Sequence, residues 1–344
     1  LSGRDARKLL QGLVTSDVDL LDEGPQYTSF LNAQGRVLFD AFLIPAPEGA
    51  VLIEAEVSAL KPLSSHLLRY KLRSKASVSD VSDDYSVIVN CGTLPTNEAS
   101  GLTPAEGGGW VDPRLPSLGV RALVPTSSVI SPPEGSVEAP AEQYALQLAL
   151  TGVFEGARAF PEGEALPLES NIELLHGISF RKGCYLGQEL TARTHFRGVV
   201  RKRLVLLVAR PLAEAAESEL ARSRLPELPA FSHLSSHERS LAAVILAQGG
   251  GGWDDLREEA AEDGTGVAAE VDTMVGLSLN DESGKSSAKL RAYMPSWGLG
   301  CGLCRLSALD GRKIGGVLSN PRGTLSVVPV RPDWWPESIS PVKS

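Results

Sequence analysis

The sequence has few cysteines, no excess of positive charge and no long apolar run, and each shortage excludes a kind of protein. Four cysteines (Cys91, Cys184, Cys301 and Cys304) are too few for a disulfide framework in 344 residues, so we expect a reducing compartment. No apolar run approaches the length of a membrane-spanning helix, which argues against a membrane protein. The net charge of −9 argues against general nucleic-acid binding, which requires Lys and Arg to neutralise phosphates.

Motifs of several enzyme classes are missing as well. The chain has no nucleotide-binding glycine loop, no hydrolase nucleophile elbow and no zinc-ligand spacing. No Arg-rich presequence precedes Leu1, so we expect that any targeting peptide has been removed or left out. The proportions of hydrophobic (42%) and charged (22%) residues are typical of a globular protein, and the length suits two or three domains or subdomains.

Residues 1–203 predict an α+β region, with a subdomain boundary near 45–140. Its first helix should begin after an N-cap at Ser2 and end near Thr15, because Leu9, Leu10, Leu13 and Val14 share one helical face. Apolar and β-branched residues on both sides of Asn32 to Gly35 predict a β-hairpin. We also expect strands at 50–55 and 119–124, two strands within 78–90, and helices at 58–72 and 142–150.

Residues 204–344 predict a small antiparallel β-barrel, because short strand-like runs are separated by glycine turns. Within this domain, 212–264 is expected to be a mobile insertion, since it contains four consecutive glycines and an acidic cluster. Cys301 and Cys304 form a C-x-x-C, but on a strand residues three apart face opposite sides, so we expect two thiols buried by packing rather than a redox pair.

The most distinctive stretch is 180–203, FRKGCYLGQELTARTHFRGVVRKR, which carries seven basic residues and one acid. Cys184 lies between Gly183 and Gly187, just after Arg181 and Lys182. Cationic neighbours and the start of a helix expected over 188–193 would favour a reactive or ligating thiolate. A small buried hydrophobe in a glycine-rich turn is the alternative. The basic residues indicate either a site for an anion or acidic partner, or a solvated strand edge protected by charge.

The run KGCYLGQE (182–189) resembles the signature of the YgfZ family, whose members are relatives of the glycine-cleavage T-protein, an aminomethyltransferase. PLESNI (167–172), GISF (177–180) and ELTARTH (189–195) resemble the mitochondrial branch in particular, and the match is ungapped over 167–203. The resemblance implies an iron–sulfur cluster assembly factor of the mitochondrial matrix that acts late, in the maturation of client [4Fe-4S] enzymes. It also implies a T-protein-like folate-binding fold, with two interwoven α+β subdomains and a small β-barrel around a central cavity.

The resemblance places the functional thiol at Cys184. The rest of the motif that it identifies is Lys182, Gly183, Tyr185, Gly187, Gln188, Glu189, Arg193 and His195. A [2Fe-2S] cluster is commonly held by four thiolates, and the chain has no second cysteine near the first. The other ligands would come from a small thiol, from Cys91 or the Cys301/Cys304 pair if the fold brings them close, or from a partner, which the resemblance identifies as an A-type iron–sulfur carrier. For His195 we expect a hydrogen bond that orients the Cys184 loop, rather than metal binding or proton transfer.

The resemblance also implies candidates for a pocket that binds tetrahydrofolate or a derivative, namely Glu169, Asp40 and Arg36. In the T-protein relatives an acid matching Glu169 binds the pterin ring, and a pair of acids follows the hairpin turn. Here that pair reads Phe39 and Asp40, so one carboxylate remains. Two functions are therefore considered: a non-enzymatic assembly factor, which the KGCYLGQE motif and the single acid favour, and a tetrahydrofolate-dependent aminomethyl transferase.

Overall fold

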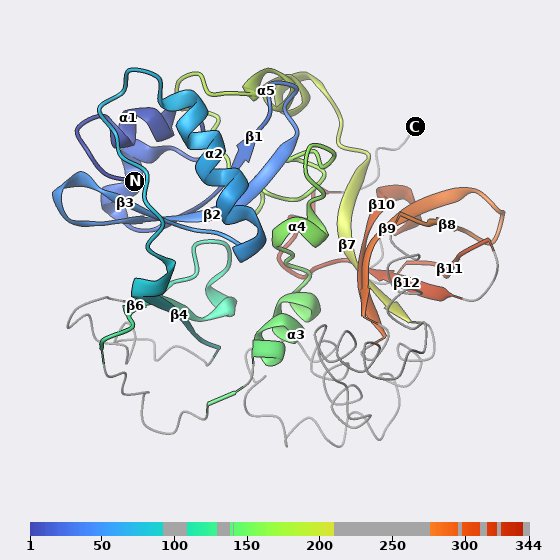
Figure 1. Cartoon of the computed structure of the whole chain (residues 1–344). Coiled ribbons are helices and arrows are strands. Elements are labelled where there is room, and N and C mark those ends of the chain that lie inside the picture. Colours follow the sequence, from blue (N-terminus) through green and yellow to red (C-terminus); the bar gives the residue numbers. More distant parts are fainter. Residues whose placement is uncertain are drawn as a thin grey trace. The chain divides into compact units, whose positions relative to one another are not determined.

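The structure, a computed structural model, describes residues 1–91, 109–128, 138–139, 141–209, 276–294, 298–309, 315–321 and 325–339. The chain forms two compact units (Figure 1). Unit 1 contains Leu1–Val137 and Glu155–Val200, and unit 2 contains Glu138–Phe154 and Arg201–Ser344. The insertion that we predicted at 212–264 lies outside the described residues. In the part of the chain described, no helix combines the length and the apolar character needed to cross a membrane.

The central element of unit 1 is an antiparallel sheet of β1 (Gln26–Leu31), β2 (Val37–Pro45) and β3 (Val51–Glu54). The predicted hairpin is confirmed: β1 and β2 pair around a turn in which Gly35 adopts a φ of 77°. The Asn32 side-chain oxygen accepts hydrogen bonds from the backbone N–H groups of Gln34 and Arg36, each at 3.0 Å. This is an Asx-type turn, which asparagine favours because its side chain replaces a backbone acceptor.

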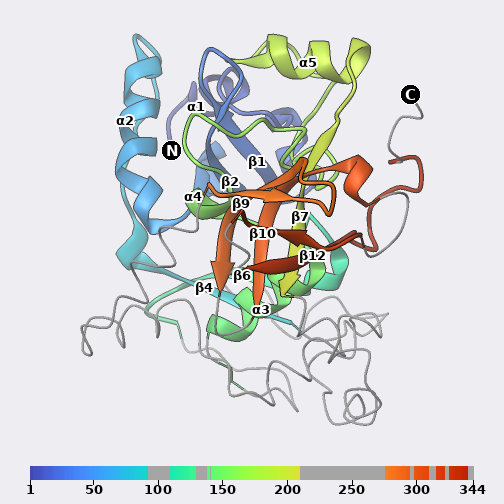
Figure 2. The same cartoon turned by 90° about the vertical axis from the view of Figure 1, so that its right-hand side faces the viewer.

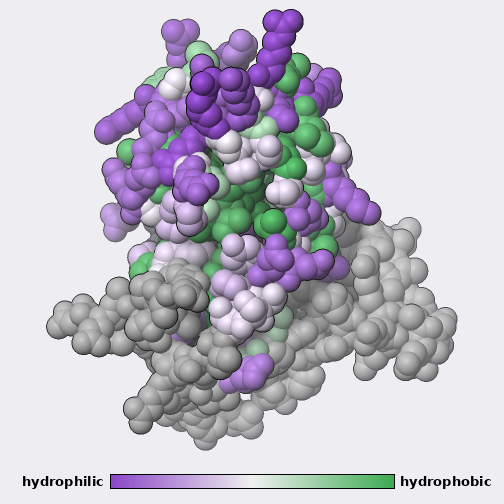
Figure 3. Space-filling model, turned by 60° about the vertical axis from the view of Figure 1, so that its left-hand side comes forward, coloured by the Kyte–Doolittle hydropathy of each residue, from purple (hydrophilic) through white to green (hydrophobic). Residues whose placement is uncertain are grey.

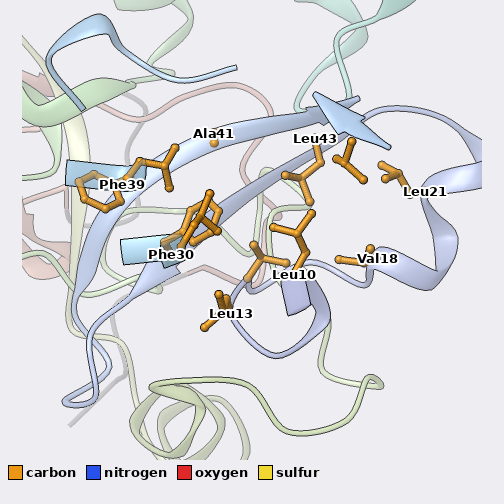
Figure 4. Packing of buried hydrophobic residues seen from close by; sticks show 12 residues of the cluster. Leu10, Leu13, Val18, Leu21, Phe30, Phe39, Ala41 and Leu43 are labelled. Carbon is orange, nitrogen blue, oxygen red and sulfur yellow. The ribbon is translucent and has the colours of Figure 1, made fainter. Parts of the chain in front are cut away.

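One face of this sheet is apolar and is covered by α1 (Ala6–Gln11) and α2 (Leu60–Lys71) (Figures 1 and 4). Side chains alternate along β2, so Phe39, Ala41 and Leu43 point into the core, where Phe30 of β1 meets them (Figure 4). The His66 ring of α2 packs edge-on against Phe30 and Phe39. The other face carries Asp40 and Phe42, and it is this face that forms part of the candidate site.

Two details of unit 1 differ from the sequence prediction. The first helix begins at Ala6 rather than after Ser2, because Ser2 pairs with Ser77 through two backbone hydrogen bonds. It also ends at Gln11 rather than near Thr15, since the Thr15 N–H donates to Ser29 of β1. Within 78–90 one strand forms instead of two, because Asp80 accepts hydrogen bonds from the Ser82 N–H and hydroxyl and starts a turn.

The remaining elements of unit 1 are short. A second sheet has the order β4 (Tyr85–Asn90), β6 (Val120–Pro125), β5 (Trp110–Val111). The helices are α4 (Gly156–Ala159) and α5 (Gln188–Arg197), and 3-10 turns form at η1 (Val18–Glu23), η2 (Pro47–Gly49), η3 (Val57–Ala59), η4 (Ser82–Asp84) and η5 (Pro116–Leu118). The structure thus confirms the predicted strands at 50–55 and 119–124 and the predicted helix at 58–72, with slightly different ends. Unit 1 also has the α+β composition that we predicted.

Unit 2 contains α3 (Ala141–Thr151) and a closed antiparallel barrel, which confirms the predicted C-terminal barrel (Figure 2). The strand order is β10 (Leu299–Arg305), β7 (Lys202–Ala209), β12 (Ser326–Val330), β11 (Leu318–Ser319), β8 (Ser278–Asn280) and β9 (Ser286–Met294). A 3-10 turn, η9 (Leu306–Ala308), follows β10. Cys301 and Cys304 both lie on β10 and are buried, as expected, and burial raises the pKa of each thiol to about 12.

Apolar side chains also reach the surface in places. Figure 3 shows a face on which hydrophilic side chains dominate the upper part and hydrophobic side chains are exposed below them. Scattered exposed apolar residues are normal for a folded protein, so an exposed apolar side chain indicates a binding surface only where its neighbours support one. The large exposed apolar residues include Leu20, Leu68 and Phe196.

Candidate functional site

The Cys184 loop, residues 177–187, is fastened to an anchor segment, residues 12–16, that follows α1. Backbone hydrogen bonds join the two near both ends of the loop, from Ser179 N to Thr15 O (2.9 Å) and from Leu186 N to Gly12 O (3.0 Å). The anchor segment has carbonyl groups available for this because α1 ends early, at Gln11. The loop is therefore held at two points by backbone that is itself tied to the core.

The Thr15 hydroxyl adds a third connection. It donates to the Gly177 carbonyl at 2.6 Å and accepts the Ser29 N–H at 2.9 Å, and Thr15 is fully buried. One side chain thus joins the start of the Cys184 loop, the anchor segment and strand β1. Nothing in the local sequence around Thr15 indicates this role, because its partner at Gly177 is 162 residues away.

The ammonium group of Lys182 provides the strongest anchor. Its Nζ donates to the Val14 carbonyl at 2.8 Å and to the Ser16 carbonyl at 2.6 Å, and it lies 5.1 Å from the centre of the Tyr185 ring. The side chain is buried, and this desolvation lowers the pKa of Lys182 to about 8, although Asp17 and Asp19 act in the opposite direction. Charge-assisted bonds to two carbonyls offset part of the cost of burying the ammonium group.

Cys184, two residues after this anchor, is exposed to solvent. The prediction of an accessible thiol is thus confirmed, and the alternative of a buried hydrophobe is wrong. The other three cysteines have thiol pKa values raised by burial, to about 11 for Cys91 and about 12 for Cys301 and Cys304. A protonated, buried thiol is a poor metal ligand or nucleophile. Of the four cysteines, Cys184 is the one that is exposed.

The loop leads directly into α5. Gly187 is the N-cap of this helix and has a φ of 79°, and a Cβ atom there would lie 2.4 Å from the Asn32 carbonyl oxygen, so glycine is required. Gly183 has neither a positive φ nor a close neighbour, so the backbone conformation requires glycine at position 187 but not at position 183. The first turn of α5 lies against the β1–β2 turn, where a Cβ on Gly35 would meet Leu190 at 3.0 Å.

The other motif residues lie on or near α5. Tyr185 is buried, Gln188 is partly buried, and Glu189, Arg193 and His195 are exposed. We expected a hydrogen bond from His195 to orient the loop. The contact that the structure shows is a ring stack on Phe180, with centroids 3.6 Å apart and planes 11° apart. Phe196, which sequence reasoning did not single out, contacts both rings edge-on.

An open groove of about 710 Å³ lies beside this aromatic group. Its lining comes from residues within 16–27, from Pro113, from residues within 173–181, and from His195 and Phe196 in the last turn of α5. Arg181 and Phe180 line it, whereas Cys184 does not, so the thiol stands beside the groove rather than within it.

The polar face of the first sheet forms the second part of the candidate site. Asp40 accepts hydrogen bonds from the Tyr27 hydroxyl (3.1 Å) and from the Gly156 N–H (3.0 Å). Desolvation, together with the nearby Glu155 carboxylate, raises the pKa of Asp40 to about 6. Arg114, fully buried beside it, forms salt bridges with Asp112 (2.8 Å) and Glu155 (2.6 Å).

The two other candidates for a folate pocket lie elsewhere in unit 1. Arg36 follows the β1–β2 turn and donates to the Glu164 carbonyl at 2.6 Å. Glu169 is partly buried in a run of turns after α4 and has an interaction partner within the protein. Phe39, next to Asp40, is buried in the apolar core, so position 39 does not face the polar side of the sheet.

Comparison with known proteins supports both the fold and the motif. The structure is similar to the glycine cleavage system aminomethyltransferase T from Bartonella henselae, with a TM-score of 0.55 and 12% sequence identity over 97% of this chain and 82% of that one. The sequence is 41% identical over 220 residues to the mitochondrial iron-sulfur cluster assembly factor IBA57 homolog of Mycosarcoma maydis. It is 35% identical over 267 residues to that of Neurospora crassa. The chain is a homologue of these assembly factors.

The resemblance inferred from the motif is thus confirmed, and so is the T-protein-like fold. The match to the IBA57 homologues covers 60% of this chain and 54% of the Mycosarcoma protein, and 72% of this chain and 60% of the Neurospora protein. The chain therefore spans little more than half the length of these relatives. No protein-family model matches the chain.

Replacing Lys182 tests whether the buried ammonium group holds the Cys184 loop. In Lys182→Met the Val14 and Ser16 carbonyls lose a donor, and each buried unsatisfied group costs about 1–3 kcal/mol. We expect the amides of 183–187 to exchange with deuterium at least about tenfold faster, since tenfold corresponds to about 1.4 kcal/mol. Arg181→Met, an exposed change in the same loop, should leave this exchange unaltered. Equal exchange in wild type and Lys182→Met would show that the loop is held by other contacts.

Replacing Asp40 tests the electrostatics of the polar face. Because the pKa of Asp40 is raised to about 6, the folded state binds more protons than the unfolded state between about pH 4 and pH 6, so stability falls as pH rises through this range. Asn can keep both contacts without the charge, because its amide oxygen can accept from the Gly156 N–H and its NH2 group can donate to the Tyr27 hydroxyl oxygen. Asp40→Asn should therefore raise the free energy of unfolding at pH 7.5 by about 1–3 kcal/mol, and by much less at pH 4.5, in urea titrations.

Asp5 provides a control, because replacing it should change the stability in the opposite direction. Its pKa is lowered, chiefly by the backbone N–H of Lys75, so Asp5→Asn should destabilise the protein at pH 7.5. If Asp40→Asn also destabilises at pH 7.5, the Asp40 carboxylate is not a desolvated charge.

Proposed function

We propose that this protein is a mitochondrial iron–sulfur cluster assembly factor that acts in the maturation of [4Fe-4S] client enzymes, with its place of action in the matrix. The names of its homologues support the role and the mitochondrial location. The observation that carries the proposal is the presentation of Cys184, an exposed thiol on a loop fastened to the core by buried hydrogen bonds.

The same observation supports a shared cluster. A [2Fe-2S] cluster, which is here the cargo, takes four ligands, commonly thiolates. In the described residues no three His, Cys, Asp or Glu side chains converge as a metal site, and burial raises the pKa values of the other three thiols, which disfavours a ligating thiolate. We propose that Cys184 provides one ligand and that an A-type carrier protein provides the others. The exposed Arg181, three residues before Cys184, would favour the anionic cluster.

The ligand role can be measured by reconstituting a cluster with purified A-type carrier. We expect Cys184→Ser to reduce the cluster absorbance of the complex at least about tenfold, because serine is a much weaker ligand for iron than a thiolate at neutral pH. Cys91→Ser is the matched control, and it should leave the spectrum unchanged. An unaltered spectrum and an unaltered complex with Cys184→Ser would remove the proposal.

A second candidate function, folate binding with aminomethyl transfer, is favoured by one observation. Asp40, on the polar face of a T-protein-like fold, keeps a carboxylate whose pKa of about 6 suits proton exchange near neutrality. In this proposal Glu169 accepts hydrogen bonds from the pterin ring of tetrahydrofolate, and Arg36 supports the pocket. An aminomethyl-transfer assay with glycine-cleavage components separates this function from carrier binding.

Calorimetric titration with tetrahydrofolate tests the pocket. We expect Glu169→Ala to weaken binding about tenfold or more, because the loss of a charge-assisted hydrogen bond costs about 1.5–3 kcal/mol. Glu189→Ala, which removes an exposed carboxylate on α5, should bind like wild type. Equal affinities for wild type and Glu169→Ala, or no binding to either, would count against a folate pocket at this position.

A further inference from the structure

The segment that contains α2 carries positive charge that nearby acids do not offset. Over 57–79 the sequence has five basic residues and no Asp or Glu, although the whole chain has a net charge of −9. The five cations are Lys61, Arg69, Lys71, Arg73 and Lys75. Within the part of the chain that the structure describes, none of them forms a salt bridge. Asp5, which accepts from the Lys75 N–H at 2.8 Å, is paired with Arg4, so this corner of unit 1 stays positive.

The dipole of α2 accounts for only part of this pattern. Cations near the C-terminal end of a helix are favourable, and Arg69 and Lys71 lie in the last turn of α2. The effect is confined to the last turn, whereas Arg73 and Lys75 come after the helix has ended. Both of these side chains are exposed. The cations beyond α2 therefore need another explanation.

Two exposed leucines lie among these cations. Leu68 and Leu72 are four residues apart, so they share one side of α2, and they are 54% and 85% exposed. Leu63 and Leu67 point to the opposite side and are buried in the core, so the side with the exposed leucines faces away from the sheet (Figure 2). Leu72 also has a φ of 45°, which residues with a side chain rarely adopt. A large apolar side chain held in solvent by an unusual backbone conformation indicates a function outside the protein's own packing.

These residues form a surface that we call the α2 patch: Leu68, Arg69, Lys71, Leu72, Arg73 and Lys75. Its chemistry suits a lipid surface better than a protein or a nucleic acid. Lysine is depleted at protein interfaces, and binding to nucleic-acid phosphates does not need exposed leucines. Lysine and arginine can extend to lipid phosphates while leucines beside them enter the apolar layer. The solvent side of a helix is also convex, so it offers no groove to a peptide.

We propose that the α2 patch binds the surface of a membrane that contains anionic phospholipids. Leu68 and Leu72 enter the boundary between head groups and acyl chains, and the four cations contact lipid phosphates. The contact is peripheral, because α2 has twelve residues and is about 18 Å long, whereas the hydrocarbon core of a bilayer is about 30 Å thick. The lack of a long apolar run thus excludes a span but not a surface contact. No residue of the Cys184 loop takes part.

Co-sedimentation of the full chain with lipid vesicles tests the proposal. Wild type should bind vesicles of phosphatidylcholine and phosphatidylglycerol in equal parts at least about tenfold more tightly than vesicles of phosphatidylcholine alone, and added salt should weaken this binding. Leu72→Ser should weaken binding to the mixed vesicles at least about threefold, because an inserted apolar group is lost. Lys71→Gln/Lys75→Gln should weaken it at least about tenfold, because two cations near the anionic surface are lost.

Two matched controls lie outside the α2 patch. Val87→Ser removes a 46% exposed apolar side chain from β4, and Lys285→Gln/Lys289→Gln removes two exposed charges from unit 2. Both should bind the mixed vesicles like wild type, and all variants should keep the circular dichroism spectrum of the folded protein. Cys184→Ser should also bind like wild type, so the cluster proposal and this one can fail separately.

Several outcomes would overturn the proposal. If wild type does not bind the mixed vesicles at low salt, or if the controls lose as much binding as the patch variants, the α2 patch is not a lipid site. Wild-type binding in both patch variants shows that another surface contacts lipid. If wild type binds single-stranded RNA but not vesicles, and Lys71→Gln/Lys75→Gln abolishes this binding, the occupant is a nucleic acid. The same result with polyglutamate shows that it is an acidic polypeptide.

Discussion

The position of the Cys184 loop depends on a buried ammonium group. The Lys182 Nζ satisfies the carbonyls of Val14 and Ser16, which lie just beyond the end of α1. Burying a cation is costly, as the lowered pKa of Lys182 shows, and two short hydrogen bonds to carbonyls offset that cost only if the geometry is kept. Buried contacts therefore fix the loop to the core while Cys184 lies on the surface. A partner that binds there has little ordering entropy to overcome.

The alternation of side chains along β2 gives the sheet two different faces. Phe39 and Ala41 belong to the apolar core under α1 and α2, whereas Asp40 and Phe42 face Tyr27 and the buried Arg114. A second carboxylate at position 39 would have to enter the core, so in this register only one acid can serve the polar face.

Much of the fold could be predicted from local patterns. The hairpin, the barrel and α5 follow from alternation, glycine turns and the motif, and the motif also identified Cys184. The anchors could not be predicted, because Lys182 and Thr15 find partners 162 to 168 residues away, and no local pattern encodes such contacts.

The early end of α1 was missed for a related reason: Leu13 and Val14 keep helical spacing, but their place in the core comes from packing beside Phe30 and not from a continued helix. The stack of Phe180 on His195 and the exposure of Phe196 were missed since both are properties of the folded surface.

On the proposed role, the shortage of ligands has a mechanistic meaning. A protein that surrounds a cluster with four thiolates has to break four bonds to release it, whereas one that provides a single thiolate has to break one. The remaining thiols here have pKa values raised by burial, which disfavours the thiolate form that binds iron.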